Sequence, residues 1–351
     1  MKKTGIAASE KRYQEPGIWE TIRELLLGVR RPLDCIQVGV SSRCPGRCAY
    51  CPHSVMKEQW VVADMDLDTF SMLWPLMRRS SRVHLQGWGE PLLNPAFFEM
   101  ATLARRAGCA VSTTTCGLIM DEKKAIRLVE GGFDVVAFSL AGTDTASNAC
   151  RQGVDFGRVC EAVTILQTVR RSRMAVHMEI HFAYLMLASN MDAVRALPAL
   201  MEKLGVHAAV ISTLDYIPRP DLAQEAFSPH ETDKLSRARE ILKETWKEAR
   251  RMGLGFHWAL PCSDAPGTKC RENIARSLYV SSDGSMSPCV YVNLPVEGLE
   301  GGRRIFGNVH DRDPLEIWDS EEFRHFRDRL ADGDPDPLCM QCVKRFECVE
   351  S

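Results

Sequence analysis

Three cysteines crowd into eight residues of this chain, in the run Cys44-Pro-Gly-Arg-Cys48-Ala-Tyr-Cys51. Thiolates at such short spacing can hold one metal centre from a single loop. An iron–sulfur cube takes four thiolates, so three would leave one iron open to another ligand. A closed zinc site would need a fourth ligand, and His53 does not stand at an ordinary finger spacing. The spacing favours an open iron–sulfur cluster, with zinc or unligated thiols as the alternatives.

A second group of thiols occupies the last quarter of the chain and contains a C-x2-C pair. Fourteen cysteines are many for a cytosolic protein, in which clustered thiols more often bind metal or do chemistry than form disulfides. The other five cysteines are scattered, and we interpret them as core thiols because free cysteine is among the most buried residue types. The second group is Cys262, Cys270, Cys289, Cys339, Cys342 and Cys348, and the scattered cysteines are Cys35, Cys109, Cys116, Cys150 and Cys160.

From about residue 33 the sequence alternates short β-branched or apolar runs with longer stretches of helical periodicity. Six such units in a row predict an α/β fold with a parallel sheet, either open or curled toward a barrel. In such sheets the site lies in the loops after the strand ends, where Cys44 to Cys51 fall. The predicted strands are 35–40, 83–87, 110–115, 135–140, 176–183 and 208–213, and the predicted helices are 68–78, 95–106, 122–130, 156–170 and 191–204.

The alternation of predicted strands and helices ends after Ile217, and the last hundred residues show a different pattern of elements. A charged helix is predicted over 229–251, a β-hairpin over 277–292 with Asp283-Gly284 as a two-residue turn, and an amphipathic helix over 314–330. We therefore divide the chain into four parts. These are an N-terminal helical cap over 1–34 with its helix near 18–27, a core over 35–217, a linking helical segment over 218–255, and a small C-terminal domain over 256–351.

The composition excludes several classes of protein. The chain of 351 residues has 44 basic and 46 acidic side chains and a formal charge of -2, so no pull toward nucleic acid or anionic membrane is implied. With 45% hydrophobic and 26% charged residues it is an ordinary globular sequence. Its apolar runs are shorter than the roughly 18 to 20 residues of a membrane span. We expect a cytoplasmic protein with neither a nucleic-acid nor a membrane partner.

The C-x3-C-x-Tyr-C run after the first strand resembles the signature of the radical S-adenosylmethionine (SAM) superfamily. The resemblance implies a 4Fe-4S cluster on Cys44, Cys48 and Cys51, whose open iron is chelated by the amino and carboxylate groups of SAM. It implies reductive cleavage of SAM to methionine and a 5'-deoxyadenosyl radical, which abstracts a hydrogen atom from substrate. The family's partial (β/α)6 TIM-like barrel matches the six units counted above.

Gln86-Gly-Trp-Gly-Glu-Pro91, after the second strand, resembles the Gly-Gly-Glu motif with which the family meets the methionyl ammonium of SAM. The resemblance assigns this role to Gly89 and Glu90, and a carboxylate facing an ammonium makes a charge-assisted hydrogen bond. Trp88 stands where the first of those glycines usually does.

Three further residues match the family's SAM-binding positions. Tyr50, before the third cysteine, is similar to the residue that packs near the adenine, and Ser139 and Arg151 resemble the polar pair that meets the ribose and carboxylate. An arginine suits a carboxylate because its fork binds both oxygens. Cys116 stands in Thr115-Cys-Gly117, where relatives often carry Thr-Asn-Gly, and receives no role. The catalytic acid or base of the substrate reaction stays unassigned.

The C-terminal cysteines resemble the SPASM or twitch extension found behind radical SAM cores, which binds an auxiliary iron–sulfur cluster with a β-hairpin and a helix. A full SPASM domain has further cysteines beyond Cys348, but the sequence ends at Ser351. We therefore expect at least one auxiliary 4Fe-4S cluster, on Cys270, Cys289, Cys339 and Cys342. Cys262 and Cys348 are further candidate ligands, and they would otherwise help to form two three-cysteine clusters.

The resemblance implies an oxidoreductase or maturase that oxidatively modifies a peptide or protein side chain, supplied with electrons by a reductant such as flavodoxin or ferredoxin. Only about 34 residues precede the first strand, which leaves no room for a peptide-recognition domain of roughly 80 residues. Dehydrogenation or decarboxylation of a small metabolite, such as an amino sugar or nucleoside, is therefore the alternative. A non-catalytic zinc-binding module is a remoter one.

Overall fold

The structure is a computed structural model that describes residues 31–262, 265–296 and 303–350, with side chains up to residue 346. The predicted N-terminal helix near 18–27, and with it most of the predicted cap, lies outside the described residues. No helix in the described part of the chain is long and apolar enough to cross a membrane.

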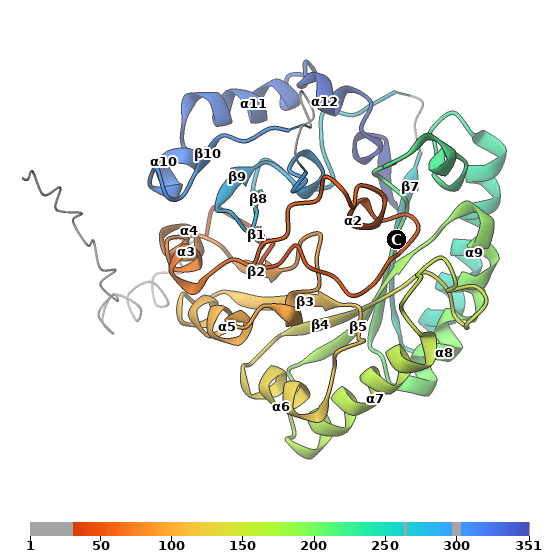
Figure 1. Cartoon of the computed structure of the whole chain (residues 1–351). Coiled ribbons are helices and arrows are strands. Elements are labelled where there is room, and N and C mark those ends of the chain that lie inside the picture. Colours follow the sequence, from red (N-terminus) through yellow and green to blue (C-terminus); the bar gives the residue numbers. More distant parts are fainter. Residues whose placement is uncertain (1–30, 263–264, 297–302, 351) are drawn as a thin grey trace, which may run out of the picture.

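Seven consecutive parallel strands form the centre of the fold (Figure 1). The six predicted strands are confirmed with small shifts of their ends, and a seventh, β7, was not predicted as a strand. Parallel strands are built from crossover connections, which place the intervening helices on the outside of the curved sheet. The strands are β1 (Cys35–Val38), β2 (Arg82–Leu85), β3 (Ala110–Thr115), β4 (Val135–Leu140), β5 (Glu179–Leu185), β6 (Ala208–Ser212) and β7 (Gly255–Pro261).

The helices of the core surround the strands on the outer side in Figure 1. The single helix predicted over 68–78 is two short helices, α3 (Leu67–Ser71) and α4 (Trp74–Met77). Pro75 explains the break, because proline has no N–H and its ring clashes with the carbonyl four residues earlier. The other core helices are α2 (Pro52–Val55), α5 (Phe97–Arg106), α6 (Glu122–Glu130), α7 (Phe156–Ser172), α8 (Leu197–Leu204) and α9 (Thr232–Arg251), with 3-10 turns η1 (Pro91–Leu93), η2 (Ala188–Ala196) and η3 (Pro220–Glu225).

Alternation along the strands separates an apolar outer face from a polar inner face. Ile36 and Val83 are register partners, fully buried in the cluster that also holds the core helices. The alternate residues Gln37, His84 and Ser112 share the other face, and Nδ1 of His84 lies 2.9 Å from Oγ of Ser112. Successive strand residues point to opposite faces, so this polar row lines the inside of the barrel.

The C-terminal segment extends the same sheet instead of forming a separate one. Strand β8 (Ser277–Val280) pairs in parallel with β1 over all four residues, which gives an 11-stranded sheet in the order β10-β9-β8-β1-β2-β3-β4-β5-β6-β7-β11. The other elements of this segment are β9 (Ser285–Ser287), β10 (Gly307–Asn308), β11 (Glu347–Glu350), α10 (Pro314–Trp318), α11 (Glu321–Ala331), α12 (Pro337–Met340), η4 (Val290–Val292) and η5 (Val343–Arg345).

Two predicted details of this segment are wrong. The hairpin is closed by three residues, 282–284, because the amide of Ser281 donates to the carbonyl of Ser285 and Gly284 takes the left-handed conformation at φ +81°. The helix predicted over 314–330 is broken at Asp319, and Ser320 caps α11 by accepting a hydrogen bond from the amide of Phe323.

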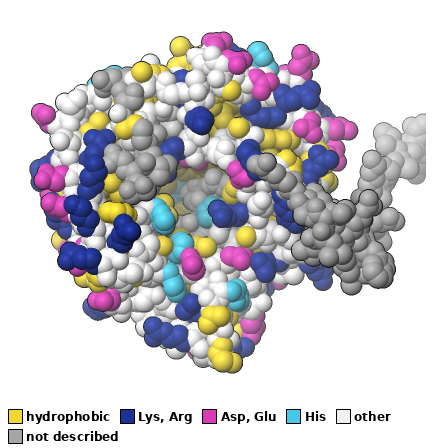
Figure 2. Space-filling view, turned by 180° about the vertical axis from the view of Figure 1, so that it is seen from behind, with side chains coloured by type: hydrophobic (Ala, Val, Ile, Leu, Met, Phe, Trp, Pro, Cys, Tyr) yellow, Lys and Arg dark blue, Asp and Glu magenta, His cyan; other side chains and the backbone are white. Residues whose placement is uncertain are grey.

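The surface carries charges of both signs without separation. Figure 2 shows lysine and arginine interspersed with aspartate and glutamate over one face, around a central hollow with histidine side chains beside it. This mixture agrees with the near-zero net charge of the sequence.

Candidate metal centres and cofactor site

The loop after β1 holds its three cysteines in a fixed backbone frame. The amides of Arg47 and Ala49 donate to the carbonyls of Gln152 and Cys150, at 2.7 and 2.8 Å. A Cβ built on Gly46 would lie 3.7 Å from Sγ of Cys44 and 3.8 Å from Sγ of Cys48, so both sulfurs turn to the same side of the loop. The segment 150–152 after β4 therefore braces the thiol loop independently of any metal.

The third thiol of this loop is largely desolvated. Burial and the neighbouring Cys48 raise the pKa of Cys51 to about 12. Its carbonyl starts α2 by accepting from the amides of Ser54 and Val55, which places the thiol at the base of that helix. Thiolates are the metal-binding form, so such a thiol is suited to a cation that displaces its proton.

Glu90 lies buried beside the thiol loop, at the end of β2. Its carboxylate accepts hydrogen bonds from Oγ1 of Thr115 at 2.7 Å, from the amide of Cys116 at 2.6 Å and from the amide of Leu92 at 3.2 Å. Burial raises the pKa of Glu90, and these donors oppose that effect. A carboxylate has about four lone-pair sites. The thiol of Cys116 is a fourth partner of this carboxylate, so an incoming ammonium would replace one of these donors.

Gly89 is required by a close approach of two backbones. A Cβ on Gly89 would lie 2.3 Å from the carbonyl oxygen of Ser41 and 2.6 Å from that of Arg43, and the amide of Glu90 donates to the latter at 2.7 Å. The Glu90 loop is therefore pinned directly on the segment that leads into the cysteines.

We expect Gly89→Ala to displace this loop, because the atoms met by the added methyl group are backbone atoms. The dissociation constant for SAM should rise at least tenfold, and the free energy of unfolding should fall by about 1–3 kcal/mol, the usual cost of overpacking. Equilibrium dialysis with labelled SAM and thermal melting measure the two effects. Gly157→Ala is the matched control, since the one atom near a Cβ at that position is a side-chain oxygen of Asp155, at 3.2 Å.

Arg151 is a buried cation at the edge of the thiol loop, with 4% of its surface exposed. One guanidinium nitrogen donates to the carbonyl of Ser139, while Nε has no partner. The neighbouring Tyr50 and Cys48 favour its charged form. Nδ2 of Asn148 is a second buried donor without an acceptor. Two such donors beside the thiols fit an anionic or carbonyl-bearing ligand, because an unsatisfied buried donor is costly.

Tyr50 is a close neighbour of Arg151. Its ring contacts a small apolar cluster that includes Leu187, Leu214 and Leu222, and burial raises the pKa of its phenol well above the ordinary value. The structure thus brings together Cys44, Cys48, Cys51, Tyr50, Glu90, Ser139 and Arg151, all of which follow or end strands at one edge of the sheet.

Cys116 also belongs to this neighbourhood, although we assigned it no role from its sequence context and interpreted it as a core thiol. It is 7% exposed at the end of β3, and its thiol interacts with those of Cys44 and with the carboxylate of Glu90. The hydrogen bond between the two thiols lowers the pKa of Cys44 and raises that of Cys116, and burial and the charge of Glu90 raise the pKa of Cys116 further. The one sequence feature that could have indicated this position is that Cys116 directly follows the predicted strand 110–115, which ends beside β2.

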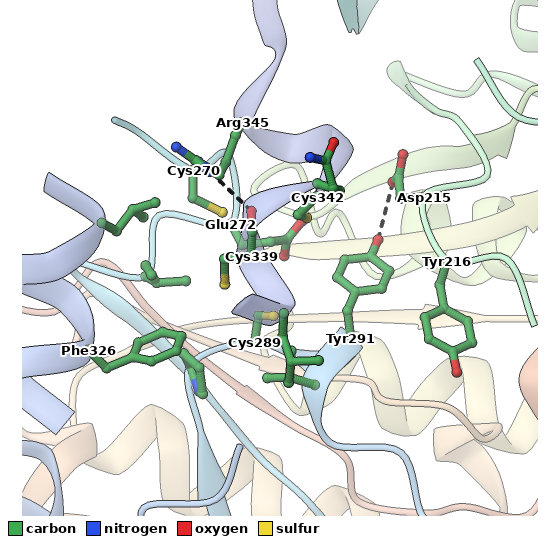
Figure 3. Close-up of a pocket in the computed structure, with 16 residues that line it drawn as sticks. Asp215, Tyr216, Cys270, Glu272, Cys289, Tyr291, Phe326, Cys339, Cys342 and Arg345 are labelled. Carbon is green, nitrogen blue, oxygen red and sulfur yellow. Dashed lines mark hydrogen bonds between the residues drawn. The ribbon is translucent and has the colours of Figure 1, made fainter. Parts of the chain in front are cut away.

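Four thiols of the second group surround a cavity of about 310 Å3 between the hairpin and α12. Figure 3 shows Cys270, Cys289, Cys339 and Cys342 around this space, and all four are free thiols. Burial raises the pKa of Cys270 to about 12 and that of Cys339 to about 11. Phe326 and Leu330 of α11 complete an apolar wall. The four predicted auxiliary ligands therefore face one cavity.

The other two predicted candidates are placed differently. Cys262, just after β7, is part of a disulfide and is not a free thiol. The backbone of Cys348 pairs with Leu260 in β11, but its side chain lies outside the described residues. Cys262 does not line the cavity described above.

A buried charge network borders the same cavity. Nζ of Lys344 lies 2.7 Å from Oδ2 of Asp215 and 3.8 Å from Oε1 of Glu272, and Tyr291 donates to Oδ2 of Asp215 at 3.3 Å. Asp215 follows β6, at the end of the sheet where a site is expected. Lys344 and Glu272 were missed, because nothing local in the sequence marks them as partners of a residue more than 50 positions away.

The spacing of the thiols and the volume of the four-cysteine cavity indicate which kind of metal centre these sites can hold. Within residues 31–262, 265–296 and 303–346, no three His, Cys, Asp or Glu side chains converge closely enough to hold a single metal ion. A structural zinc site needs four ligands at 2.0–2.3 Å from one atom. Four thiols spread around about 310 Å3 fit a multi-atom iron–sulfur cluster better than one zinc ion.

His84 on the inner face should remain neutral down to acidic pH. Burial and the charge of Arg82 lower its pKa to about 4, against about 6.5 in an unfolded chain. Below pH 6.5 the unfolded state binds more protons, so stability is lost as the pH falls from 6.5 toward 4. We expect the melting temperature of His84→Gln to fall less steeply over that range than that of the wild type. The exposed His325→Gln should follow the wild type.

Comparison with known proteins agrees with these two sites. The model of the radical SAM superfamily matches residues 38–187, and the SPASM iron–sulfur cluster-binding domain matches residues 270–343. The chain is 26% identical over 329 residues to the tungsten-containing aldehyde ferredoxin oxidoreductase cofactor-modifying protein of Pyrococcus furiosus, covering 88% of this chain and 87% of the relative. It is 26% identical to PqqA peptide cyclase of Gluconobacter oxydans, over 87% and 81% of the two chains.

The fold is also that of a solved structure, Streptococcus suis SuiB bound to S-adenosylmethionine, with a TM-score of 0.65 and 15% identity over 88% of this chain and 73% of the other. The domains matched carry a 4Fe-4S cluster with SAM and an auxiliary iron–sulfur centre, so a non-catalytic zinc module is excluded. The chain is a radical SAM enzyme, a member of that superfamily with a C-terminal SPASM domain.

Proposed function

We propose that this radical SAM enzyme oxidatively modifies a side chain of a peptide or protein, with one auxiliary 4Fe-4S cluster on Cys270, Cys289, Cys339 and Cys342. The observation that carries the proposal is the cavity lined by these four free thiols, which lies directly behind the loop of Glu90. Trp88 of that loop donates to the carbonyl of Val290, the residue after Cys289, at 3.1 Å.

The residues at the first site would bind SAM as follows. Cys44, Cys48 and Cys51 would hold the cluster, whose bound form together with SAM supplies hydrogen-atom abstraction. The carboxylate of Glu90 would take the ammonium in place of one of its present donors, and the unpartnered Nε of Arg151 would donate to a carboxylate. Tyr50 would pack against the adenine from its apolar cluster.

The second site supports an oxidative outcome. Loss of a hydrogen atom leaves a substrate one electron and one proton away from a closed-shell oxidised product. A cluster in the four-cysteine cavity would accept that electron, since it lies next to the SAM loop and is shielded by Phe326 and Leu330. A reductant such as flavodoxin or ferredoxin would resupply the electron that the SAM-site cluster gives to SAM, and the auxiliary cluster would pass the electron from the substrate to an oxidised electron carrier.

The likeness to PqqA peptide cyclase, over most of both chains, supports a peptide or protein substrate. The second candidate is the dehydrogenation or decarboxylation of a small metabolite such as an amino sugar or nucleoside. It is favoured by the polar inner face around Gln37, His84 and Ser112, which suits a ligand with several hydroxyl or amide groups.

The test begins with anaerobically reconstituted protein, dithionite and SAM, in which 5'-deoxyadenosine is quantified. Deuterium-labelled peptide pools and deuterated amino sugars or nucleosides are then compared for transfer of deuterium into 5'-deoxyadenosine. Transfer from peptide supports the proposal, and transfer from the small metabolites alone supports the second candidate. Protein with both clusters that forms no 5'-deoxyadenosine would overturn radical chemistry altogether.

A further inference from the structure

Trp88 stands between two glycines that have no space for a side chain. A Cβ on Gly87 would lie 2.6 Å from Cα of Gly39, and one on Gly89 would lie 2.3 Å from the carbonyl of Ser41. The backbone of this loop is thus pressed against the segment that follows β1. Trp88 is the residue between them whose side chain extends away, and it extends toward the C-terminal segment.

The indole of Trp88 contacts that segment through both its polar and its apolar atoms. Nε1 donates to the carbonyl of Val290 at 3.1 Å. Its ring lies 6.1 Å from the ring of Tyr216 and 6.1 Å from that of Tyr291, in edge-to-face arrangements.

These contacts continue to the auxiliary thiols. Tyr291 and Tyr216 line the four-cysteine cavity, as Figure 3 shows, and Tyr291 donates to Asp215. Asp215 pairs with Lys344, two residues after Cys342. Val290 directly follows Cys289. A displacement of the Glu90 loop would therefore reach Val290, which is next to Cys289, and Lys344, which is two residues from Cys342.

The same side chain also contacts the region of the first cluster. Trp88 packs on the apolar group of Trp60, Leu294 and Val296, together with Met56, which follows α2. Helix α2 begins directly after Cys51. Trp88 is thus placed where the cysteine loop, the SAM loop and the C-terminal segment meet.

From these contacts we propose that Trp88 is a positioning residue that couples SAM binding at the first site to the redox properties of the auxiliary cluster. The inference rests on the proposed function, which places clusters at both sites. Binding of SAM at Glu90 would shift the Trp88 indole, and with it the hydrogen bond to Val290 beside the auxiliary ligand Cys289. Coupling between two sites is reciprocal, so the redox state of the auxiliary cluster would change the affinity for SAM by the same factor.

The test is an EPR-monitored redox titration of the auxiliary cluster in the full-length holoprotein, with and without saturating SAM. Cys289→Ala protein, which would retain only the SAM-site cluster, supplies the spectrum to subtract. Trp88→Phe keeps a ring beside the two tyrosines but loses the N–H donor, and Trp88→Gly removes both. Trp246→Phe in α9 is the matched control, since Trp246 contacts Arg250 on the outside of the barrel.

We expect SAM to shift the midpoint potential of the auxiliary cluster in the wild type and in Trp246→Phe. The shift should be at least halved in Trp88→Phe and absent in Trp88→Gly, while both variants keep the full iron content. An equal shift in all four proteins, or no shift in wild-type protein that binds SAM, overturns the coupling. Failure of the proposed function is a different result, namely missing clusters or absent SAM cleavage.

Discussion

Replacing Cys44, Cys48 and Cys51 together by alanine is expected to lower the iron content from about eight to about four atoms per chain, the content of one four-iron cluster. Formation of 5'-deoxyadenosine should fall to the background. The loop itself should persist, because backbone hydrogen bonds to the carbonyls of Cys150 and Gln152 hold it without the thiols. Iron and sulfide analysis of anaerobically reconstituted protein, with chromatographic detection of 5'-deoxyadenosine, measures both effects.

Cys160→Ala is the matched control for this variant. Cys160 lies in α7 on the outer side of the barrel and its side chain is half-buried, so its loss should change neither the iron content nor SAM cleavage. If the triple variant kept about eight irons, the open cluster would have to be held elsewhere, and the assignment of the SAM site would be wrong.

Cys289→Ala should also remove about four irons, but with a different effect on the chemistry. The SAM loop remains intact, so SAM cleavage should continue. The amount of oxidised product should fall, because no auxiliary cluster accepts the electron of the substrate radical. The ratio of 5'-deoxyadenosine to product should therefore rise by at least tenfold. Cys342→Ala, on the opposite chain segment of the same cavity, should behave in the same way.

Cys262→Ala is the matched control for the auxiliary site. Cys262 is disulfide-bonded and does not line the four-cysteine cavity, so the iron content should remain at about eight. A wild-type content of about twelve irons would instead indicate a second auxiliary cluster, and Cys262 and Cys348 would then be its candidate ligands.

The rhythm of strands and helices was predictable because each βα unit carries its own local signals. Gly205, for example, ends α8 in the left-handed conformation, as its place after an apolar stretch predicts. The break at Pro75 was in principle visible as well, since proline inside a helical pattern interrupts it. Boundaries of helices and strands that depend only on local chemistry can thus be predicted from the sequence.

Strand β7 was missed because its recognition depends on a distant partner. Residues 255–261 follow a long charged helix and contain both a glycine and a proline, which locally indicate the end of an element. Only pairing with β6 on one side and β11 on the other makes the segment a strand. The same reasoning applies to β8, whose parallel pairing with β1 no local pattern encodes.

The candidate site shows the same division. Spacing marks Cys44, Cys48 and Cys51, and the resemblance of the run 86–91 to a family motif marks Glu90. In contrast, the proximity of Cys116 to Cys44 and the pairing of Lys344 with Asp215 join residues of different units of the fold. Side chains that meet across different units carry no sequence signal of their meeting.

The parallel pairing of β1 with β8 has a consequence for how the two halves of this enzyme can be handled. The segment that carries the auxiliary thiols supplies the neighbour of the very strand that leads into Cys44. Cutting the chain between the matched domains would bare the hydrogen-bonding edges of both β1 and β8, and bare strand edges recruit other chains. Each half is therefore a poor candidate for separate expression or for grafting onto a foreign partner, and the enzyme is best engineered as one folding unit.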